Sequence, residues 1–344
     1  MRYQLFGRSG LRVSELCLGT MTFGEVVTWG TTRDESRAIF DAFVEAGGNF
    51  VDTANVYTRG TSERLVGEFI AAERERYVVG TKYTMCSPNG DPNVAGNQRK
   101  NMVQSLEASL KRLGTDYVDL YWVHAWDFVT PVEEVMRGLD DLVRSGKVLY
   151  IGISNAPAWV IAQANTLADL RGWTSFAGIQ VNYSLIERTA ERDLLPMARS
   201  FDLAVAAWSP LAGGLLTGKY NLAAGADPRR LDSSTAVSVD ARNLAIAAAV
   251  QDVVRETDFT PSQVALAWVR QDGTIPVLGA RTATQITDNL ACLGVELSHE
   301  HTRRLNDASQ VEPGFPHDFL ARDNIRNSVF GGFRDRIDRG GRSW

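Results

Sequence analysis

Short apolar segments alternate with amphipathic helical segments along most of this chain, and that alternation limits the folds it can adopt more than any other feature. The apolar segments are nearly continuous runs of Val, Ile and Leu, as in parallel strands that are buried on both faces. Eight such segments are expected to form strands, at residues 16–20, 50–54, 77–82, 118–124, 149–154, 178–183, 203–209 and 274–278. Eight strand–helix units favour an α/β fold, a (β/α)8 barrel of the TIM type, over an open doubly wound sheet.

The segments between the strands support the barrel. Helical patterns occupy residues 35–46, 63–72, 100–113, 132–145, 159–169 and 192–200. A doubly wound sheet usually carries Gly-x-Gly-x-x-Gly after its first strand, whereas this chain reads Gly19-Thr20-Met21-Thr22-Phe23-Gly24 there. Residues 4–13 predict a hairpin around a Gly/Ser turn. Residues 313–344 are expected to pack as an irregular C-terminal tail, which gives one domain over residues 1–344.

Polar, titratable side chains stand where three of the predicted strands end. Asp52 closes one apolar strand, and Tyr57 follows five residues later, just past the turn. The next two strands deliver Lys82 and His124. In a parallel barrel the carboxyl ends of the strands lie on one face, and active sites are found on that face. We therefore expect these four side chains to meet in an active site.

A phenol beside an ammonium suggests acid–base chemistry. A lysine cation lowers the pKa of a phenol from about 10, so Tyr57 is expected to exchange a proton near neutral pH with Lys82 beside it. Asp52 would hold the lysine, and His124 would orient a substrate carbonyl or relay the proton. Taken singly, Asp52 fits a strand-end cap, Tyr57 a half-buried aromatic and His124 a core histidine. Their joint occurrence at strand ends favours the catalytic interpretation.

Composition limits the partners. The chain has 344 residues, of which 44% are hydrophobic, and a net charge of −5, so it can bury a large core and is poorly suited to bind nucleic acid or an anionic membrane. Neither a signal peptide nor a membrane span is apparent. The three cysteines, Cys17, Cys86 and Cys292, are odd in number and widely spaced, which favours reduced, mostly buried thiols and a cytoplasmic location over a metal site.

A set of motifs resembles the aldo-keto reductases, from the hairpin to about Leu297. The motifs are Asp52-x4-Tyr57, Thr81-Lys82, His124, Gly152-Ile153-Ser154-Asn155, Gln180-Val181-Asn182-Tyr183, Trp208-Ser209-Pro210-Leu211, and Gly279-Ala280-Arg281 with Gln285 and Asn289. The segment from Trp208 to Tyr220 is similar to the branch that includes potassium-channel β subunits and many bacterial reductases. The resemblance implies a (β/α)8 barrel that binds NADP(H) without a Rossmann fold and reduces aldehydes or ketones to alcohols, with Tyr57 as the proton donor and no metal ion.

The resemblance also implies a cofactor site. Ser154, Asn155 and Gln180 suit the nicotinamide carboxamide, Trp208 the nicotinamide ring, and Lys219 the pyrophosphate. The whole set expected to bind the cofactor is Gly19, Thr20, Met21, Asp52, Ser154, Asn155, Gln180, Trp208, Ser209, Pro210, Leu211, Gly213, Lys219, Arg229, Gly279, Arg281, Gln285, Asp288 and Asn289. From the residues alone, turn chemistry, core packing and a solvated arginine remain alternatives for Ser154, Trp208 and Arg281.

The end of the eighth strand has the character of an anion site. Gly279-Ala280-Arg281-Thr282 leads into a helix, whose N-terminus attracts phosphate groups. Arg281 would there bind an adenosine 2′-phosphate, which favours NADP(H) over NAD(H).

The function has an alternative from another class. A cofactor-binding regulatory subunit of the channel-β type would turn over substrate only incidentally, although the resemblance places His124 where those subunits lack the histidine. The loops determine which substrate is bound. Candidates for the lining of the substrate pocket are Phe23, Trp29, Tyr83, Trp126 and Trp173, together with Phe315 and Phe319 of the tail. We expect a small-molecule carbonyl partner, and homo-oligomerisation is left open.

Overall fold

Eight parallel strands close into a barrel in the computed structural model, which describes residues 1–26, 29–86, 90–220 and 237–338. The strands follow one another around the barrel in chain order, and the last, β10, pairs with the first, β3. Their bounds are β3 Cys17–Gly19, β4 Phe50–Asp52, β5 Val78–Tyr83, β6 Val118–Val123, β7 Val148–Ser154, β8 Gly178–Asn182, β9 Ala204–Trp208 and β10 Ile275–Leu278. The predicted TIM-type barrel is confirmed, and the open sheet is excluded.

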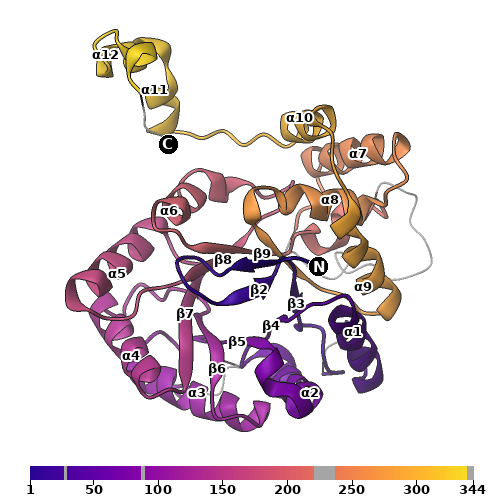
Figure 1. Cartoon of the computed structure of the whole chain (residues 1–344), viewed down its shortest axis with the longest axis vertical. Helices are drawn as coiled ribbons and strands as arrows, with labels where there is room; N and C mark the ends of the chain where they lie inside the picture. Colours follow the sequence, from indigo (N-terminus) through magenta and orange to yellow (C-terminus); the bar gives the residue numbers. More distant parts are fainter. Residues whose placement is uncertain (27–28, 87–89, 221–236, 339–344) are drawn as a thin grey trace.

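Helices form the outer layer, as Figure 1 shows. Those around the barrel are α1 Arg33–Glu45, α2 Thr61–Ile70, α3 Arg99–Leu113, α4 Val132–Arg144, α5 Ala158–Arg171, α6 Leu194–Ser200, α7 Ala241–Arg255, α8 Pro261–Val269, α9 Ala283–Leu290 and α10 His299–Ala308. Local sequence fixes where they begin: α1 starts at a capping box, in which Thr32 and Glu35 satisfy each other's backbone N–H groups.

The predicted N-terminal hairpin is confirmed, and it lies across one end of the barrel, its base (Figure 1). Its strands, β1 Tyr3–Leu5 and β2 Arg12–Ser14, pair in antiparallel fashion. Phe6, fully buried, packs edge-on against Phe50 and Trp122, with ring centroids 5.8 and 6.1 Å apart. Because Gly178 has no Cβ, the ring of Phe6 fits over it; a Cβ there would lie 2.5 Å from that ring. The base is thus filled with aromatic side chains, and the opposite end holds the polar ones.

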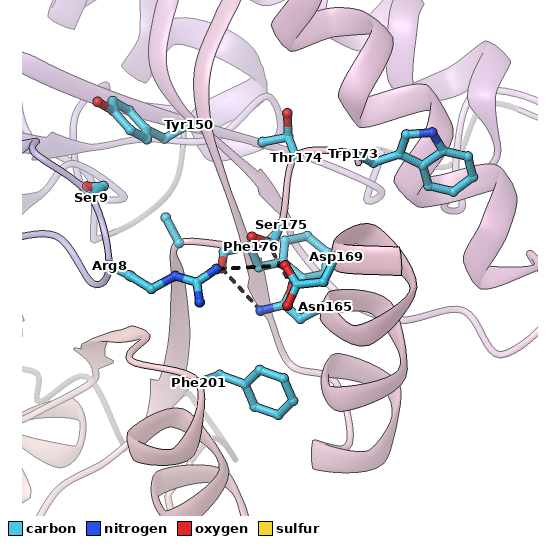
Figure 2. Close-up of a pocket in the computed structure, with 11 residues that line it drawn as sticks. Arg8, Ser9, Tyr150, Asn165, Asp169, Trp173, Thr174, Ser175, Phe176 and Phe201 are labelled. Atoms are coloured by element: carbon cyan, nitrogen blue, oxygen red, sulfur yellow. Dashed lines mark hydrogen bonds and ion pairs between the residues drawn. The ribbon is translucent and has the colours of Figure 1, made fainter. Parts of the chain in front are cut away.

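A pocket of about 340 Å³ lies at this closed end of the barrel (Figure 2). Arg8 of the hairpin turn reaches Asp169 of α5 across it, with 3.7 Å between guanidinium and carboxylate. Ala177 and Phe201, which line the pocket, come just before β8 and β9. The pocket therefore lies at the amino ends of the strands, away from the predicted catalytic residues.

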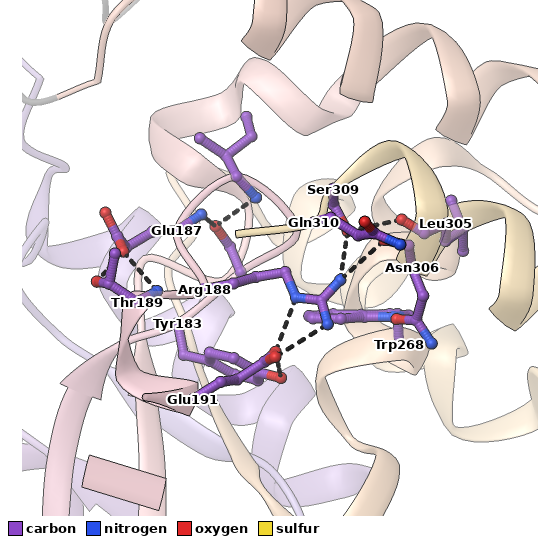
Figure 3. Close-up of polar contacts among 12 residues, drawn as sticks. Tyr183, Glu187, Arg188, Thr189, Glu191, Trp268, Leu305, Asn306, Ser309 and Gln310 are labelled. Atoms are coloured by element: carbon purple, nitrogen blue, oxygen red, sulfur yellow. Dashed lines mark hydrogen bonds and ion pairs between the residues drawn. The ribbon is translucent and has the colours of Figure 1, made fainter. Parts of the chain in front are cut away.

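A polar cluster fastens the end of the barrel domain to the loop after β8 (Figure 3). Arg188 donates to both carboxylate oxygens of Glu191, to the carbonyl of Asn306 and to the hydroxyl of Ser309. Its guanidinium also lies 5.1 Å from the ring centre of Trp268 in α8. This cluster fixes α10 over the loop and sets the point from which the C-terminal segment leaves.

The C-terminal segment differs from the prediction of an irregular, packed tail. It forms two short helices, α11 His317–Ala321 and α12 Asp323–Val329, which Figure 1 shows standing away from the barrel. Phe315 is 87% exposed, so the prediction that it lines a pocket is wrong, and Phe319 is also exposed. No helix in the described part of the chain has the length and apolar character needed to cross a bilayer.

Candidate active site

The four predicted catalytic residues meet at the carboxyl end of the barrel. Asp52 ends β4, Lys82 lies near the end of β5, and His124 directly follows β6. Lys82 Nζ donates to Asp52 Oδ2, to the carbonyl of Thr53 at 2.9 Å and to Tyr57 Oη at 3.1 Å. The rings of Tyr57 and His124 stand edge to face, 6.0 Å apart. Lys82 is fully buried and Asp52 almost so, whereas Tyr57 is partly exposed.

A tight turn positions Tyr57. Three residues in succession, Thr58, Arg59 and Gly60, adopt positive φ angles of 45°, 57° and 81°. The first two have side chains, for which this left-handed conformation is unfavourable. Thr58 compensates with its hydroxyl, which donates to the carbonyl of Phe23 at 2.6 Å and accepts from the backbone N–H of Ser62 at 3.0 Å. These two hydrogen bonds fix the turn and therefore the position of the Tyr57 phenol.

Burial has the largest effect on the pKa values of Tyr57, Lys82 and Asp52. It raises the pKa of Tyr57 above the ordinary 10.0, and the opposing effect of Lys82 does not offset it. The prediction that Lys82 brings the phenol near neutrality is therefore wrong for the chain by itself: Tyr57 is protonated at neutral pH, which is the form a proton donor needs. Burial tends to lower the pKa of Lys82, but Asp52 and Tyr57 outweigh it and raise that pKa above 10.5. Burial also raises the pKa of Asp52, against the effect of Lys82.

His124 is a neutral imidazole. Burial, with a smaller effect of Lys82, lowers its pKa from 6.5 to about 3. Within the described residues its Nδ1 atom is buried and has no hydrogen-bond partner. Asn155 Nδ2 donates to the backbone carbonyl of His124 at 2.9 Å, which ties the end of β7 to that of β6. The backbone of His124 is thus fixed, and its imidazole keeps one buried nitrogen that no described residue satisfies.

The three residues predicted for the carboxamide lie beside this group and support it. Gln180 Nε2 donates to Asp52 Oδ1 at 3.1 Å, so both oxygens of that carboxylate are engaged. Ser154 Oγ donates to the carbonyl of Gln180 at 2.8 Å and accepts from Asn155 Nδ2 at 2.9 Å. Asn155 itself is exposed, with φ at 49°. These groups therefore form one connected layer with the tetrad Asp52, Tyr57, Lys82 and His124.

The residues after β9 lie at the same end of the barrel as the tetrad. Trp208 ends the strand and is partly buried, and its Nε1 is another buried atom without a partner among the described residues. The chain then turns sharply, with φ at 56° for Ser209 and 64° for Gly213, and a short 3-10 segment from Ala212 to Thr217 follows. Pro210 is buried and Leu211 partly so, while Lys219 lies near Gly214. Arg229 lies outside the described residues.

The residues predicted to bind a phosphate lie around the start of the helix after β10. Arg281 is exposed just before α9, and its backbone N–H donates to Gln285 Oε1 at 2.9 Å. Thr282 caps the helix by accepting from the N–H of Gln285. Asn289 is buried and donates to the carbonyl of Gly279. Asp288 does not join them, because it accepts hydrogen bonds from Thr260 and Gln263 at the start of α8.

The end of β3, the strand next to β10, lies at the same end of the barrel as the tetrad. Gly19 is packed against β10, since a Cβ there would lie 2.7 Å from Val277 Cγ1. Thr20 is buried and its hydroxyl donates to the carbonyl of Asp52 at 3.0 Å, so it supports β4 from behind. Met21 is partly exposed.

The aromatic residues considered for the pocket separate into three groups. Phe23 and Tyr83 are fully buried in the core, and Trp173 lines the pocket at the closed end, so these three do not line the active site. Trp126, two residues after His124, is partly exposed on the active-site side, and Trp29 is partly exposed.

Asn55 was missed from the sequence. Its Oδ1 is buried and unpaired within the described chain, while its Nδ2 donates to Met85. Its position between Asp52 and Tyr57 was the available signal.

A closed parallel barrel that gathers a carboxylate, a phenol, an ammonium and an imidazole at the carboxyl ends of its strands is the architecture of a barrel enzyme with acid–base chemistry. The described residues contain no cluster of His, Cys, Asp and Glu arranged to hold a metal ion. The chain belongs to the aldo/keto reductase family, whose model matches residues 15–310.

Curated relatives agree over most of their length. The chain is 38% identical over 330 residues to norsolorinic acid reductase of Aspergillus flavus, covering 92% of this chain and 83% of that protein. It is 39% identical over 323 residues to the uncharacterized oxidoreductase YrpG of Bacillus subtilis, with 89% and 95% covered. An aryl-alcohol dehydrogenase of Phanerodontia chrysosporium, named for NADP(+), is 36% identical over 342 residues, with 91% and 87% covered. The family and these relatives support an oxidoreductase that acts on small molecules.

Proposed function

We propose that this protein is an NADP(H)-dependent reductase that converts aldehyde or ketone carbonyls to alcohols, with Tyr57 as the proton donor. The observation that carries the proposal is the contact of Lys82 Nζ with Tyr57 Oη at 3.1 Å, in a buried site that also holds a neutral His124. A protonated phenol, a permanent cation behind it and a neutral imidazole beside it are what a carbonyl oxygen needs as it gains negative charge.

The residues at the carboxyl end of the barrel fit a nicotinamide cofactor. Three buried polar atoms there lack partners within the described residues: His124 Nδ1, Trp208 Nε1 and Asn55 Oδ1. Buried polar groups are nearly always paired, so unpaired atoms at the carboxyl ends of three barrel strands point to a polar ligand. Ser154, Asn155 and Gln180 would hold the nicotinamide carboxamide, and Trp208 would pack on the ring. A bound NADPH supplies the hydride for the carbonyl carbon.

Residues of the chain donate the proton and stabilise the phenolate that remains. Tyr57 Oη donates its proton to the carbonyl oxygen, and the phenolate left behind faces the Lys82 ammonium. Asp52 and the Thr53 carbonyl hold that ammonium in place, so it stabilises the phenolate without reorganisation. His124 hydrogen-bonds the substrate oxygen and sets its direction. Solvent at the partly exposed Tyr57 then restores the proton.

Exposed and partly exposed residues at the carboxyl end of the barrel suggest the choice of cofactor and the class of substrate. The exposed Arg281, next to the N-terminus of α9, would bind the 2′-phosphate of NADP(H). A relative named for NADP(+) points the same way. For the substrate we propose aromatic aldehydes and ketones. Trp126 follows β6 and Trp208 ends β9, at the same end of the barrel as the tetrad, and the relative from Phanerodontia chrysosporium is named for aryl alcohols.

A substrate screen tests this function. Oxidation of NADPH should be followed with aromatic aldehydes and ketones against aliphatic aldehydes of similar reactivity. Turnover of the aromatic carbonyls, abolished in Tyr57→Phe, supports the proposal. If tight NADPH binding occurs with no turnover of any carbonyl, the regulatory-subunit alternative is favoured instead.

A further inference from the structure

A buried carboxylate outside the tetrad connects the two elements that carry its acid–base pair. Glu63, in the first turn of α2, is completely buried. One of its oxygens accepts from the Thr81 hydroxyl at 2.6 Å, and the other from Arg112 Nε of α3. A buried carboxylate is costly unless it is paired and hydrogen-bonded, so both contacts are needed to keep Glu63 there.

The first contact reaches the strand that carries Lys82. Successive side chains of a strand point to opposite faces. Thr81 therefore points out toward α2 and Glu63, while Lys82, the next residue, points in toward Asp52 and Tyr57. The hydrogen bond from Thr81 to Glu63 thus holds the end of β5 from outside, at the residue before the ammonium.

The second contact reaches the turn that carries Tyr57. Arg112 packs over Gly60, the last residue of that turn: a Cβ on Gly60 would lie 2.7 Å from Arg112 Cδ and 2.9 Å from its Nε. Gly60 has φ at 81° and provides no side-chain cap for α2. The salt bridge from Glu63 therefore holds the Arg112 side chain against Gly60, three residues after Tyr57.

We propose that Glu63 is a positioning residue for proton transfer, which sets the separation of Lys82 Nζ and Tyr57 Oη by tying the strand of one to the turn of the other. This inference rests on the proposed function of the same site. Glu63 touches none of the tetrad, so it acts through Thr81 and Arg112. Loss of its contacts should let the ammonium and the phenol move apart.

The consequence is a change in the acidity of Tyr57. The charged or titratable groups that act on its phenol are Lys82 of β5, Asp52 of β4 and Cys17 of β3, and Lys82 also acts on the neighbouring His124. Of these only Lys82 lowers the pKa of Tyr57. Moving it away raises that pKa further and makes the phenol a poorer acid. A misplacement of about 1 Å can lower turnover by about 10²-fold.

The chain offers a matched control in Asp119 of β6, whose contacts hold the start of β5. Asp119 is also buried, accepts from Arg74 Nη2 at 2.7 Å and from the Val79 N–H at 2.9 Å, and so makes an equivalent ion pair at the start of β5. Asp119→Asn should lower the melting temperature as Glu63→Gln does. It should leave the titration of Tyr57 and the turnover number unchanged.

The experiment compares Glu63→Gln, Thr81→Val and Asp119→Asn in the full chain. Thr81→Val removes one hydroxyl and keeps the shape, so it preserves the test if Glu63→Gln fails to fold. NMR of ring-labelled tyrosine, assigned with Tyr57→Phe, gives the pKa of Tyr57 without turnover. Calorimetry gives the affinity for NADPH, and a carbonyl assay gives kcat and KM.

We expect Glu63→Gln and Thr81→Val to raise the pKa of Tyr57 and to lower kcat by about 10- to 100-fold, with NADPH affinity and KM retained. A wild-type Tyr57 titration and kcat in both variants, with a melting temperature lowered as in Asp119→Asn, would make Glu63 only structural and overturn the inference. If the wild-type chain reduces no carbonyl, the proposed function fails, while the NMR titration still decides whether Glu63 positions the pair.

Discussion

Lys82 Nζ lies 3.1 Å from Tyr57 Oη while it is also hydrogen-bonded to Asp52 and to the Thr53 carbonyl. An ammonium has three hydrogens to donate, so every one of them is used inside the site. The cation therefore cannot swing away, and the phenol has a fixed positive charge beside it.

Removal of the ammonium should abolish turnover and destabilise the fold. Lys82→Met leaves Asp52 buried without its cation, and breaking a buried ion pair in this way costs about 3–5 kcal/mol. Adding Asp52→Asn should restore part of the free energy of unfolding and none of the activity. Denaturant unfolding and NADPH oxidation measure the two effects. Substantial turnover in Lys82→Met would exclude the lysine from the chemistry.

Arginine should not replace this lysine. Lys82 is fully buried against three acceptors, and a planar guanidinium does not fit that compact site. We expect Lys82→Arg to reduce carbonyls as poorly as Lys82→Met. Recovery of wild-type kcat in Lys82→Arg would show that a positive charge suffices, wherever it lies.

His124 should contribute a pH dependence to stability. Its pKa falls from 6.5 to about 3 on folding, so the unfolded chain takes up the proton first as the pH drops. The stabilisation is fully present above pH 6.5 and is lost as the pH falls toward 3. Between pH 6.5 and 5 this amounts to about 2 kcal/mol, at about 1.36 kcal/mol per pH unit.

The variant His124→Asn isolates that effect. Denaturant unfolding at pH 7 and pH 5 should show a smaller loss of stability in His124→Asn than in the wild type. His299→Asn, at an exposed histidine of α10, should behave like the wild type. Equal losses in His124→Asn and the wild type would mean that His124 titrates normally in the folded protein.

Arg281 should set cofactor preference. NADPH differs from NADH by the 2′-phosphate, so Arg281→Ala should weaken NADPH binding by about 1.5–3 kcal/mol, the scale of a hydrogen bond to a charged group, and leave NADH nearly unchanged. The preference should shrink with added salt. Calorimetric titrations with both cofactors measure it, with Arg171→Ala, an exposed arginine at the end of α5, as the control. Equal losses for both cofactors would indicate that Arg281 only supports its loop.

The sequence predicted the barrel and the tetrad for the same physical reason. Strands buried on both faces leave an apolar pattern that few other elements share, and a polar residue at the end of such a strand stands out against it. Asp52, Lys82 and His124 are all of this kind. The N-terminal hairpin was equally readable, because its turn residues are Gly and Ser.

Other features depend on tertiary surroundings that a sequence does not display. Glu63 resembles a solvated charge near a helix N-terminus, and only Thr81 and Arg112 in the folded chain reveal it as a buried acceptor. The direction of the Tyr57 pKa shift was mispredicted because the effect of burial cannot be weighed before the fold is known. Trp173 was misplaced because a loop aromatic gives no sign of which end of the barrel it faces.

The substitution Tyr57→Phe decides whether Tyr57 donates the proton. The change keeps the ring and removes only the hydroxyl that Lys82 contacts. Tyr77→Phe, at a buried tyrosine that precedes β5 at its other end, is the control for loss of a hydroxyl. We expect Tyr57→Phe to lower kcat for carbonyl reduction by at least about 10²- to 10⁴-fold, as loss of general acid catalysis does, with NADPH affinity retained and Tyr77→Phe fully active. Carbonyl reduction by Tyr57→Phe at the wild-type rate would show that Tyr57 is not the proton donor.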